Sequence, residues 1–149
     1  MFHFCKQGFD LILVAKDSQR LSDAKTSLLS DGRTESVEAY SIDFENPTAT
    51  SAALDAIAVT HPDITHLINA HGVMSEKMSK TLKTTDAEWR RVMSINLDSV
   101  FQIVNRLLPA IVEARNGRVV IFSACLGRMS GPGNAGGLAP YRISKAGVN

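Results

Sequence analysis

Tyr141 and Lys145 are the residues of this sequence whose types and spacing could do chemistry together. Four positions apart on a helix, their side chains lie on one face, one turn from each other. A free tyrosine has a pKa of about 10 and is a poor base at neutral pH, but a neighbouring ammonium group favours the phenolate and lowers that pKa. Such a pair can donate and accept a proton in carbonyl and alcohol chemistry. Chance also places this pair on many surface helices, so the rest of the chain must decide between the two interpretations.

The composition is that of a globular protein with no charge bias. The chain has 149 residues, a formal net charge of +1 and 44% hydrophobic residues, which gives no indication of nucleic-acid or anionic-membrane binding. No apolar run approaches the roughly 18 residues of a membrane span, and residues 1–6 lack the features of a signal peptide. Cys5 and Cys125 are far apart and show no metal-ligand spacing. We therefore expect free thiols, no metal site, one domain and a cytoplasmic location.

Strands and helices are predicted to alternate along the chain. Short apolar runs predict buried strands, and caps followed by apolar residues at helical spacing predict helices. Alternation of this kind indicates βαβ units, in which a parallel sheet carries helices on both faces. The predicted strands are 9–15, 35–42, 65–69 and 118–123, and the predicted helices are 1–7 (its end only), 17–29, 46–60, 85–115 and one that contains Tyr141.

Polar residues follow the predicted strands where each strand ends. They are Lys16, Asp43, the run from Asn69 to Gly72, and Ser123. In open parallel sheets the ligand binds beyond the carboxyl ends of the strands. We therefore expect these residues to converge on one rim of the sheet.

In this order, the landmarks resemble the short-chain dehydrogenase/reductase family over essentially the whole chain. The loop Asn69-Ala70-His71-Gly72 is similar to the Asn-Asn-Ala-Gly motif of the family, and Ser94-Ile95-Asn96-Leu97 carries its helix asparagine. The strand that ends at Ser123 resembles the one that leads to the family's serine, and Tyr141-x-x-x-Lys145 completes the pattern. The resemblance implies a doubly wound parallel sheet of the Rossmann type and an NAD(P)-dependent oxidoreductase.

The same resemblance implies the roles of five residues. Tyr141 would be the general acid that protonates a carbonyl oxygen, or the base in the reverse direction. Lys145 would lower the pKa of Tyr141 and bind the nicotinamide ribose, and Asn96 would hold a water that links Lys145 to solvent. Asn69 would line the path of the cofactor, and Asp43 would contact its adenine.

Lys16 bears on the choice between NADP and NAD. NAD-preferring relatives usually carry an acidic residue at the end of the second strand, whereas this sequence has Val14-Ala15-Lys16 in that region. A cation there would attract the 2′-phosphate of NADP, so we expect NADP to be favoured over NAD. Asp17, the next residue, weakens this expectation, and the alternative is that Lys16 is a solvated lysine at the start of a helix.

Two departures concern the ends of the fold. The glycine-rich phosphate loop and the first strand of the family would precede Gly8, and the chain starts inside the helix that follows them. The chain also stops at Asn149, inside the tyrosine helix, before the later strands and the substrate lid. We therefore expect residues 1–149 to form a partial, incomplete Rossmann-like domain. Its second and fourth strands would have lost their shared inner neighbour, so that they either stay unpaired or pair with each other.

A third departure lies at the family's serine. The family pattern is Ser-Ser-x-x-Gly with the second serine functional, and the corresponding run here is Ser123-Ala124-Cys125-Leu126-Gly127. Ala124 stands at the functional position, and Ser123 or Ser130 are the possible replacements. His71, in the preceding strand's loop, is expected to be structural and not catalytic.

Two functional hypotheses follow. The first is an oxidoreductase that transfers a hydride between NAD(P)(H) and a small-molecule carbonyl or alcohol. The second is a non-catalytic fragment or pseudo-enzyme that binds a full-length relative through the long helix at 86–115, the surface we also expect for a homo-oligomer. A flavodoxin-like binding module would explain the alternation of strands and helices but not the spacing of Tyr141 and Lys145.

Overall fold

The computed structural model describes residues 2–30, 34, 36–75, 81–130 and 137–149. The chain forms two compact units, residues 1–43 and 44–149. The prediction of one domain over residues 1–149 stays a prediction. Strands and helices alternate in both units, and all strand pairs in the described residues are parallel. The predicted fold class, an α/β protein with parallel strands, is confirmed.

The first unit is a two-stranded parallel sheet with helices. Its elements are α1 (Phe2–Lys6), β1 (Leu11–Ala15), α2 (Ser18–Ser30) and β2 (Val37–Ser41). Gly8 follows α1 with a φ of 77°, the left-handed conformation in which glycine ends a helix. The Asp17 carboxylate caps α2 by accepting the Arg20 N–H at 3.0 Å. The core contains Cys5, Leu28 and Val37, with Leu11 and Leu13 packed against them.

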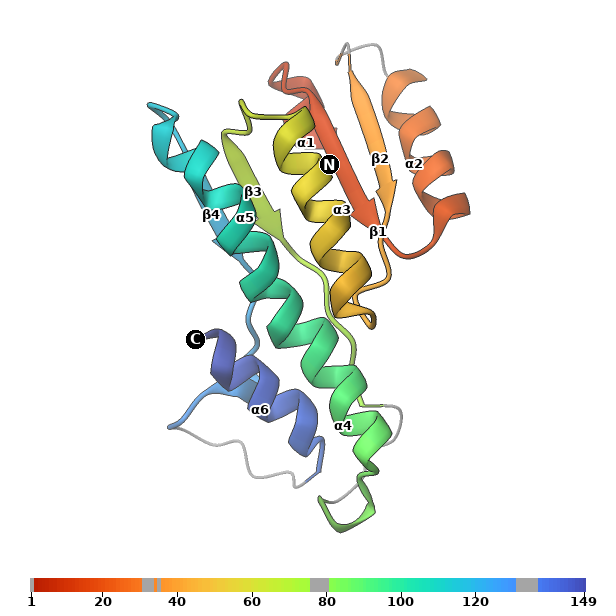
Figure 1. The fold of residues 1–149 in the computed structure, drawn as a ribbon, viewed down its shortest axis with the longest axis vertical. Coiled ribbons are helices and arrows are strands. Elements are labelled where there is room, and N and C mark those ends of the chain that lie inside the picture. Colours follow the sequence, from red (N-terminus) through yellow and green to blue (C-terminus); the bar gives the residue numbers. More distant parts are fainter. Residues whose placement is uncertain (1, 31–33, 35, 76–80, 131–136) are drawn as a thin grey trace. The chain divides into compact units, whose positions relative to one another are not determined.

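The second unit carries the remaining elements, shown in Figure 1. The Asn46 side chain caps its first helix by accepting the Ala49 N–H at 3.1 Å, and Thr85 caps the long helical segment by accepting the Glu88 N–H at 3.2 Å. Asparagine and threonine are common residues at this position of a helix. The elements are α3 (Pro47–Thr60), β3 (His66–Asn69), the 3-10 turn η1 (Thr81–Lys83), α4 (Asp86–Met93), the π-turn η2 (Ser94–Asp98), α5 (Ser99–Glu113), β4 (Arg118–Ile121), the 3-10 turn η3 (Cys125–Gly127) and α6 (Ala139–Val148).

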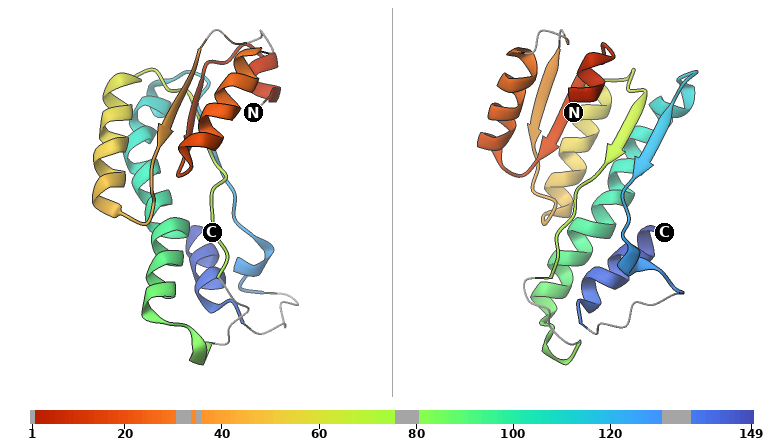
Figure 2. Two further views of the ribbon diagram at one scale, coloured as in Figure 1. Left: turned by 90° about the vertical axis from the view of Figure 1, so that its right-hand side faces the viewer. Right: turned by 180° about the vertical axis from the view of Figure 1, so that it is seen from behind.

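Strands β3 and β4 pair in parallel from His66 opposite Arg118 to Asn69 opposite Ile121. Helix α5 lies beside α3 and contacts β3, as Figures 1 and 2 both show. These helices and strands bury an apolar core that includes Leu54, Ile57 and Leu107. The carboxyl ends of β3 and β4 point toward α6 (Figure 2), which places the residues after both strands next to the tyrosine helix.

The strand pairs agree with the doubly wound order 3-2-1-4-5 of the family. Numbered as in the family, β1 and β2 are strands 2 and 3, and β3 and β4 are strands 4 and 5. Within the described residues they form two separate two-stranded sheets, β1–β2 and β3–β4.

The long helix predicted at 85–115 is unbroken from Asp86 to Glu113 but not regular. At Ser94–Asp98 it widens into a π-turn, where the Ser99 N–H donates to the Ser94 carbonyl five residues earlier. Turns of this type are rare and frequently lie at functional sites. This π-turn could not be predicted from the sequence, because the apolar spacing through this region fits a regular helix. Asn96 lies in the middle of the turn.

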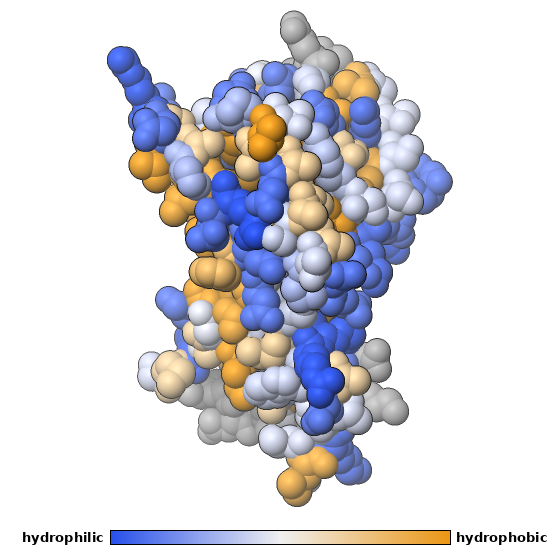
Figure 3. Space-filling model, in the orientation of Figure 1, coloured by the Kyte–Doolittle hydropathy of each residue, from blue (hydrophilic) through white to orange (hydrophobic). Residues whose placement is uncertain are grey.

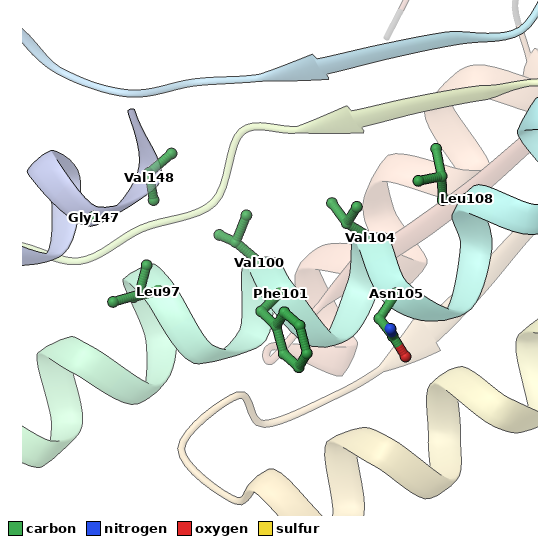
Figure 4. A pocket seen from close by; sticks show the side chains of 8 residues that line it. All are labelled: Leu97, Val100, Phe101, Val104, Asn105, Leu108, Gly147 and Val148. Atoms are coloured by element: carbon green, nitrogen blue, oxygen red, sulfur yellow. The ribbon is translucent and has the colours of Figure 1, made fainter.

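No helix in the described part of the chain is long and apolar enough to cross a membrane. Helix α5 nevertheless exposes several apolar side chains, among them Phe101 at 67% and Val112 at 69%. Figure 3 shows hydrophobic residues gathered between α5 and α6. An apolar groove with a volume of about 330 Å³ runs there, and its lining is shown in Figure 4: Leu97, Val100, Phe101, Val104, Asn105, Leu108, Gly147 and Val148.

Candidate active site

Asn96 joins three parts of the second unit through its side chain. Its Oδ1 accepts the Val73 N–H at 2.8 Å, and its Nδ2 donates to the Val73 carbonyl at 2.9 Å and to the Ser144 hydroxyl at 3.1 Å. The side chain is fully buried. Both amide hydrogens are therefore used, and Asn96 fixes the loop after β3 to the π-turn and to α6.

Lys145 is buried, with 5% of its surface exposed. Its Nζ donates to the Phe122 carbonyl, just past the end of β4, at 2.9 Å. Burial lowers the pKa of the Lys145 ammonium from its ordinary value of 10.5, because desolvation disfavours the charged form. The amine thus lies at the carboxyl end of β4 and is easier to deprotonate than a surface lysine.

Two glycines allow the backbone to approach Lys145. A Cβ on Gly72 would lie 3.3 Å from Asn96 Oδ1 and 3.4 Å from Lys145 Nζ. A Cβ on Gly127 would lie 2.6 Å from the backbone carbon of Lys145, a distance that real side chains do not reach. Only glycine lets η3 pack directly against α6 at this point, which explains the glycine that closes the Ser-Ser-x-x-Gly pattern.

Tyr141 lies one turn before Lys145 on α6 and is half-buried. Its hydroxyl makes no hydrogen bond to any residue in the described ranges, while its backbone carbonyl accepts from the Ser144 hydroxyl at 2.8 Å. The phenol therefore has its hydrogen-bonding capacity available for a ligand. Asn96 and Lys145 thus contact the segments that follow β3 and β4, through Val73 and Phe122.

The serine region departs from the family pattern in its contacts as well. Ser123 Oγ donates to the Lys145 backbone carbonyl at 3.1 Å, so its proton is already used in joining this loop to α6. Ala124, at the position of the functional serine, is half-buried and has extended backbone. Ser130 is exposed on the turn that follows η3.

The loop after β3 holds two further polar side chains. Asn69 is 4% exposed, and neither of its side-chain amide atoms has a hydrogen-bond partner among the residues that the structure describes. His71 stacks on Phe44, with ring centroids 4.5 Å apart, and its Nε2 lies 2.8 Å from the Ile95 carbonyl. Burial, and secondarily the charge of Lys145, lower the pKa of His71. These contacts agree with the structural role expected for this histidine.

Lys16 and Asp43, the predicted cofactor contacts of the first unit, form an ion pair. Lys16 Nζ lies 2.8 Å from Asp43 Oδ2, and 63% and 44% of the two side chains are exposed. The Ser41 hydroxyl also donates to the Lys16 carbonyl at 2.9 Å. The pair lies at the carboxyl ends of β1 and β2, as predicted, but the sequence did not reveal that the two side chains neutralise each other.

Sequence reasoning missed four contributors to the site. They are the backbone of Val73, the Phe122 carbonyl, the hydroxyl of Ser144 and the close approach of Gly127. Contacts made by backbone groups cannot be recognised from residue types. The Ser144 side chain could have been recognised, because position i+3 from Tyr141 lies on the same helix face.

A parallel α/β fold, with a tyrosine and a buried lysine one turn apart beside the strand ends, defines a Rossmann-like protein of the dehydrogenase class. The chain belongs to the short chain dehydrogenase family, whose family model matches residues 2–149.

Curated relatives agree with this assignment. The chain is 29% identical over 103 residues to the 3-oxoacyl-[acyl-carrier-protein] reductase FabG of Escherichia coli. The aligned region covers 69% of this chain and 40% of that protein. It is 34% identical over 120 residues to dehydrogenase RED2 of Cochliobolus heterostrophus. Here the aligned region covers 80% of this chain and 42% of that protein. The chain thus spans less than half the length of these relatives.

A solved structure shows the same fold. A metagenomic short-chain oxidoreductase in complex with NADP matches 99% of this chain and 64% of its own, with a TM-score of 0.84 and 23% identity.

Proposed function

We propose that this chain contributes the proton-transfer site of an oxidoreductase that interconverts a carbonyl and an alcohol. The observation that supports the proposal is that buried Asn96 contacts the loop after β3 and the tyrosine helix, and that buried Lys145, one turn after Tyr141, contacts the Phe122 carbonyl just past β4. Tyr141 is the proton donor to the carbonyl oxygen in reduction and the acceptor in oxidation. Its hydroxyl is uncommitted within the described structure, as a group that binds substrate must be.

Lys145 and Asn96 act through Tyr141. The Phe122 carbonyl accepts one of the three Lys145 ammonium hydrogens, so two remain for a ribose hydroxyl or a water. Both hydrogens of the Asn96 amide are used, so a relay water would bind at the remaining lone pair of its Oδ1 or at its backbone carbonyl.

The residues present fit a nicotinamide dinucleotide. Asn69 offers a buried amide at the end of β3 that has no partner within the described ranges, the kind of group that a bound polar ligand satisfies. Gly72 keeps the space above Lys145 free of a side chain. When bound, the cofactor supplies the hydride, and we propose that Lys145 and Asn69 contact it.

We further propose NADP over NAD. Lys16 is a largely exposed cation beyond β1, and phosphate groups are bound by such lysines. Asp43 already pairs with it, so a 2′-phosphate would compete with this carboxylate, and the preference should be modest. We propose that Asp43 accepts from the adenine amino group.

The alternative is a non-catalytic protein of the same family. The specific observation in its favour is the serine region, where Ala124 carries no hydroxyl and the Ser123 proton is used by Lys145. A missing donor to the substrate oxygen can cost about 10²–10³ in turnover. In this case the chain would act by binding another copy or a longer relative.

We propose that the helical segment from α4 to α5 is the surface that binds a second copy or a longer relative, whether or not the chain is catalytic. Apolar residues at spacings of three and four form a single stripe on a helix. Here the stripe consists of Leu97, Phe101, Val104, Leu108 and Val112. Two copies of one stripe can pack about a two-fold axis. A Phe101→Glu substitution should lower the sedimentation-derived mass if the homo-oligomer forms.

The experiment that tests the proposed function combines binding and turnover. The wild-type chain and a Tyr141→Phe variant are melted with and without NADPH and NADH, and both are assayed for NADPH oxidation with a panel of ketones that includes 3-oxoacyl thioesters. A ligand at about 100 times its Kd adds roughly 2.7 kcal/mol, a shift of several degrees. The proposal expects both proteins to be stabilised by NADPH and only the wild type to turn over. Stabilisation without turnover in the wild type would favour the non-catalytic alternative, and no stabilisation would contradict the cofactor site.

A further inference from the structure

Ser144, the residue before Lys145, is fully buried on α6 where this helix packs against the π-turn η2. Its hydroxyl makes two hydrogen bonds: it accepts from Asn96 Nδ2 at 3.1 Å and donates to the Tyr141 carbonyl at 2.8 Å. An amide nitrogen only donates and a carbonyl oxygen only accepts, so the direction of both bonds is fixed. The chain of hydrogen bonds from Asn96 to Tyr141 therefore runs through this one hydroxyl.

The face of α6 that carries Ser144 approaches the π-turn closely. Ser144 and Gly147 are three positions apart and therefore lie on the same face of the helix. A Cβ on Gly147 would lie only 3.1 Å from the side chain of Leu97, the residue after Asn96. At this face α6 presents two small residues to the π-turn, and the Ser144 hydroxyl is the group that bonds to Asn96.

Three further hydrogen bonds in the described part of the chain attach the end of α6 to the segment after β4. The pairs are the Ser123 hydroxyl with the Lys145 carbonyl, Lys145 Nζ with the Phe122 carbonyl, and the Asn149 side chain with the Gly127 carbonyl. All three use residues at least one turn after Tyr141. Loss of the Ser144 hydroxyl would therefore leave the end of the helix attached, while the bond from the turn of Tyr141 to η2 is lost.

We propose that Ser144 is a positioning residue that holds Tyr141 in place relative to Asn96 and the π-turn. Without the hydroxyl, one Nδ2 hydrogen of Asn96 would be buried without its acceptor, which is strongly disfavoured. The helix would then shift until water or another acceptor reaches this hydrogen, and Tyr141 would move with it, because the two residues are one turn apart. The effect of this movement on turnover rests on the proposed function, whereas the movement itself does not.

The test compares Ser144→Ala with Ser123→Ala, a matched control that also removes one hydroxyl bonded to a backbone carbonyl of α6. The chain has 2 tyrosines, Tyr40 and Tyr141, so ¹³C-tyrosine labelling gives two sets of ring resonances in NMR spectra. We expect the Tyr141 resonances to shift by more than a line width in Ser144→Ala and clearly less in Ser123→Ala, while those of Tyr40 stay in place. Unmoved Tyr141 resonances in Ser144→Ala, or equal shifts in the two variants, would overturn the proposal.

The side-chain amide of Asn96 reports on the other end of the bond. One of its hydrogens bonds to the Val73 carbonyl and the other to Ser144. In Ser144→Ala the resonance of the second hydrogen should move upfield, because a hydrogen bond deshields its proton, and an unmoved resonance would overturn the proposal. If this variant does not fold, the wild type decides. A nuclear Overhauser cross-peak between this amide and the Ser144 β hydrogens is expected, and its absence would overturn the proposal.

Turnover separates a positioning role from a purely structural one. In an active wild type, Ser144→Ala should lower kcat about tenfold or more and change KM by less than about twofold, because misplacement of a reacting group by about 1 Å can cost 10²-fold in rate. An equal loss of kcat in Ser123→Ala would overturn the positioning role. An inactive wild type would contradict the proposed function alone, because the tyrosine and amide resonances are measured without cofactor or substrate.

Discussion

Asn96 and Val73 exchange a pair of hydrogen bonds, one in each direction, between the π-turn and the loop after β3. The side chain of Asn96 thus satisfies both polar backbone groups of Val73, as a neighbouring strand would. This explains why an asparagine, mildly unfavourable inside a helix, is buried there.

Replacement of Asn96 by alanine should therefore destabilise the protein by about 2–4 kcal/mol, because both groups of Val73 lose their partner. The measurement is urea unfolding followed by circular dichroism. Asn105→Ala is the matched control, since Asn105 is an exposed asparagine on α5, and it should change the free energy of unfolding by less than about 0.5 kcal/mol. Equal effects of the two substitutions would contradict the role of Asn96.

The lowered pKa of Lys145 predicts a pH dependence of stability. Between the folded pKa and the ordinary value of 10.5, the unfolded chain binds more protons at this residue than the folded chain does. Stability therefore rises with pH in that window, and the unfavourable contribution of the buried charge is fully present below it. In Lys145→Met this part of the slope should disappear. Free energies of unfolding of both proteins at several alkaline pH values test this, and identical slopes would show that Lys145 is not desolvated.

Gly127 should tolerate no side chain. Its Cβ would meet the Lys145 backbone at 2.6 Å, whereas that of Gly147 would meet only the tip of the flexible Leu97 side chain at 3.1 Å. We expect Gly127→Ala to lower stability by about 1–3 kcal/mol or more through overpacking. The matched control Gly147→Ala should be close to neutral, because alanine also gains helix propensity over glycine. Thermal melts of both variants distinguish the two cases, and a harmless Gly127→Ala would mean that η3 does not pack on α6 this closely.

Restoration of the missing hydroxyl tests the two functional hypotheses. If the chain is a catalyst that lacks one donor, Ala124→Ser should raise kcat by about tenfold or more, within the range that such donors supply. Ser123→Ala is the control, and its effect on kcat should be smaller, because the Ser123 hydroxyl bonds to the Lys145 backbone. Steady-state assays with NADPH and the ketone panel measure both. No turnover in any of the three proteins would support the non-catalytic alternative.

The ion pair between Lys16 and Asp43 predicts opposite effects on cofactor choice. Asp43→Asn removes the competing carboxylate and should tighten NADPH binding more than NADH binding, whereas Lys16→Ala should weaken NADPH selectively. Exposed pairs of this kind contribute only about 0–1 kcal/mol to folding, so neither variant should unfold. Titration calorimetry with both cofactors gives the ratio of affinities. An unchanged ratio in both variants would remove Lys16 from the proposal.

Much of the fold was predictable because its signals are local. The strand 118–123 and the helix after Pro47 followed from apolar runs and caps, and their observed bounds differ by two residues or fewer. The site was predictable only as a set of residue types. The use of Asn96 to bind Val73, the commitment of Ser123 to Lys145 and the pairing of Lys16 with Asp43 all depend on how distant segments meet. The π-turn escaped prediction because the apolar spacing through Ser94–Asp98 fits a regular helix equally well.

The hydrogen bond from Lys145 to Phe122 joins residues 23 positions apart, and the one from Asn96 to Ser144 joins residues 48 positions apart. Closing such loops costs chain entropy before any contact stabilises the result. During folding, the site should therefore form after the local helices, and its contacts should be among the first to open in the native state. Any interaction that holds α6 against the end of β4 would then also raise the fraction of molecules in which the site is formed.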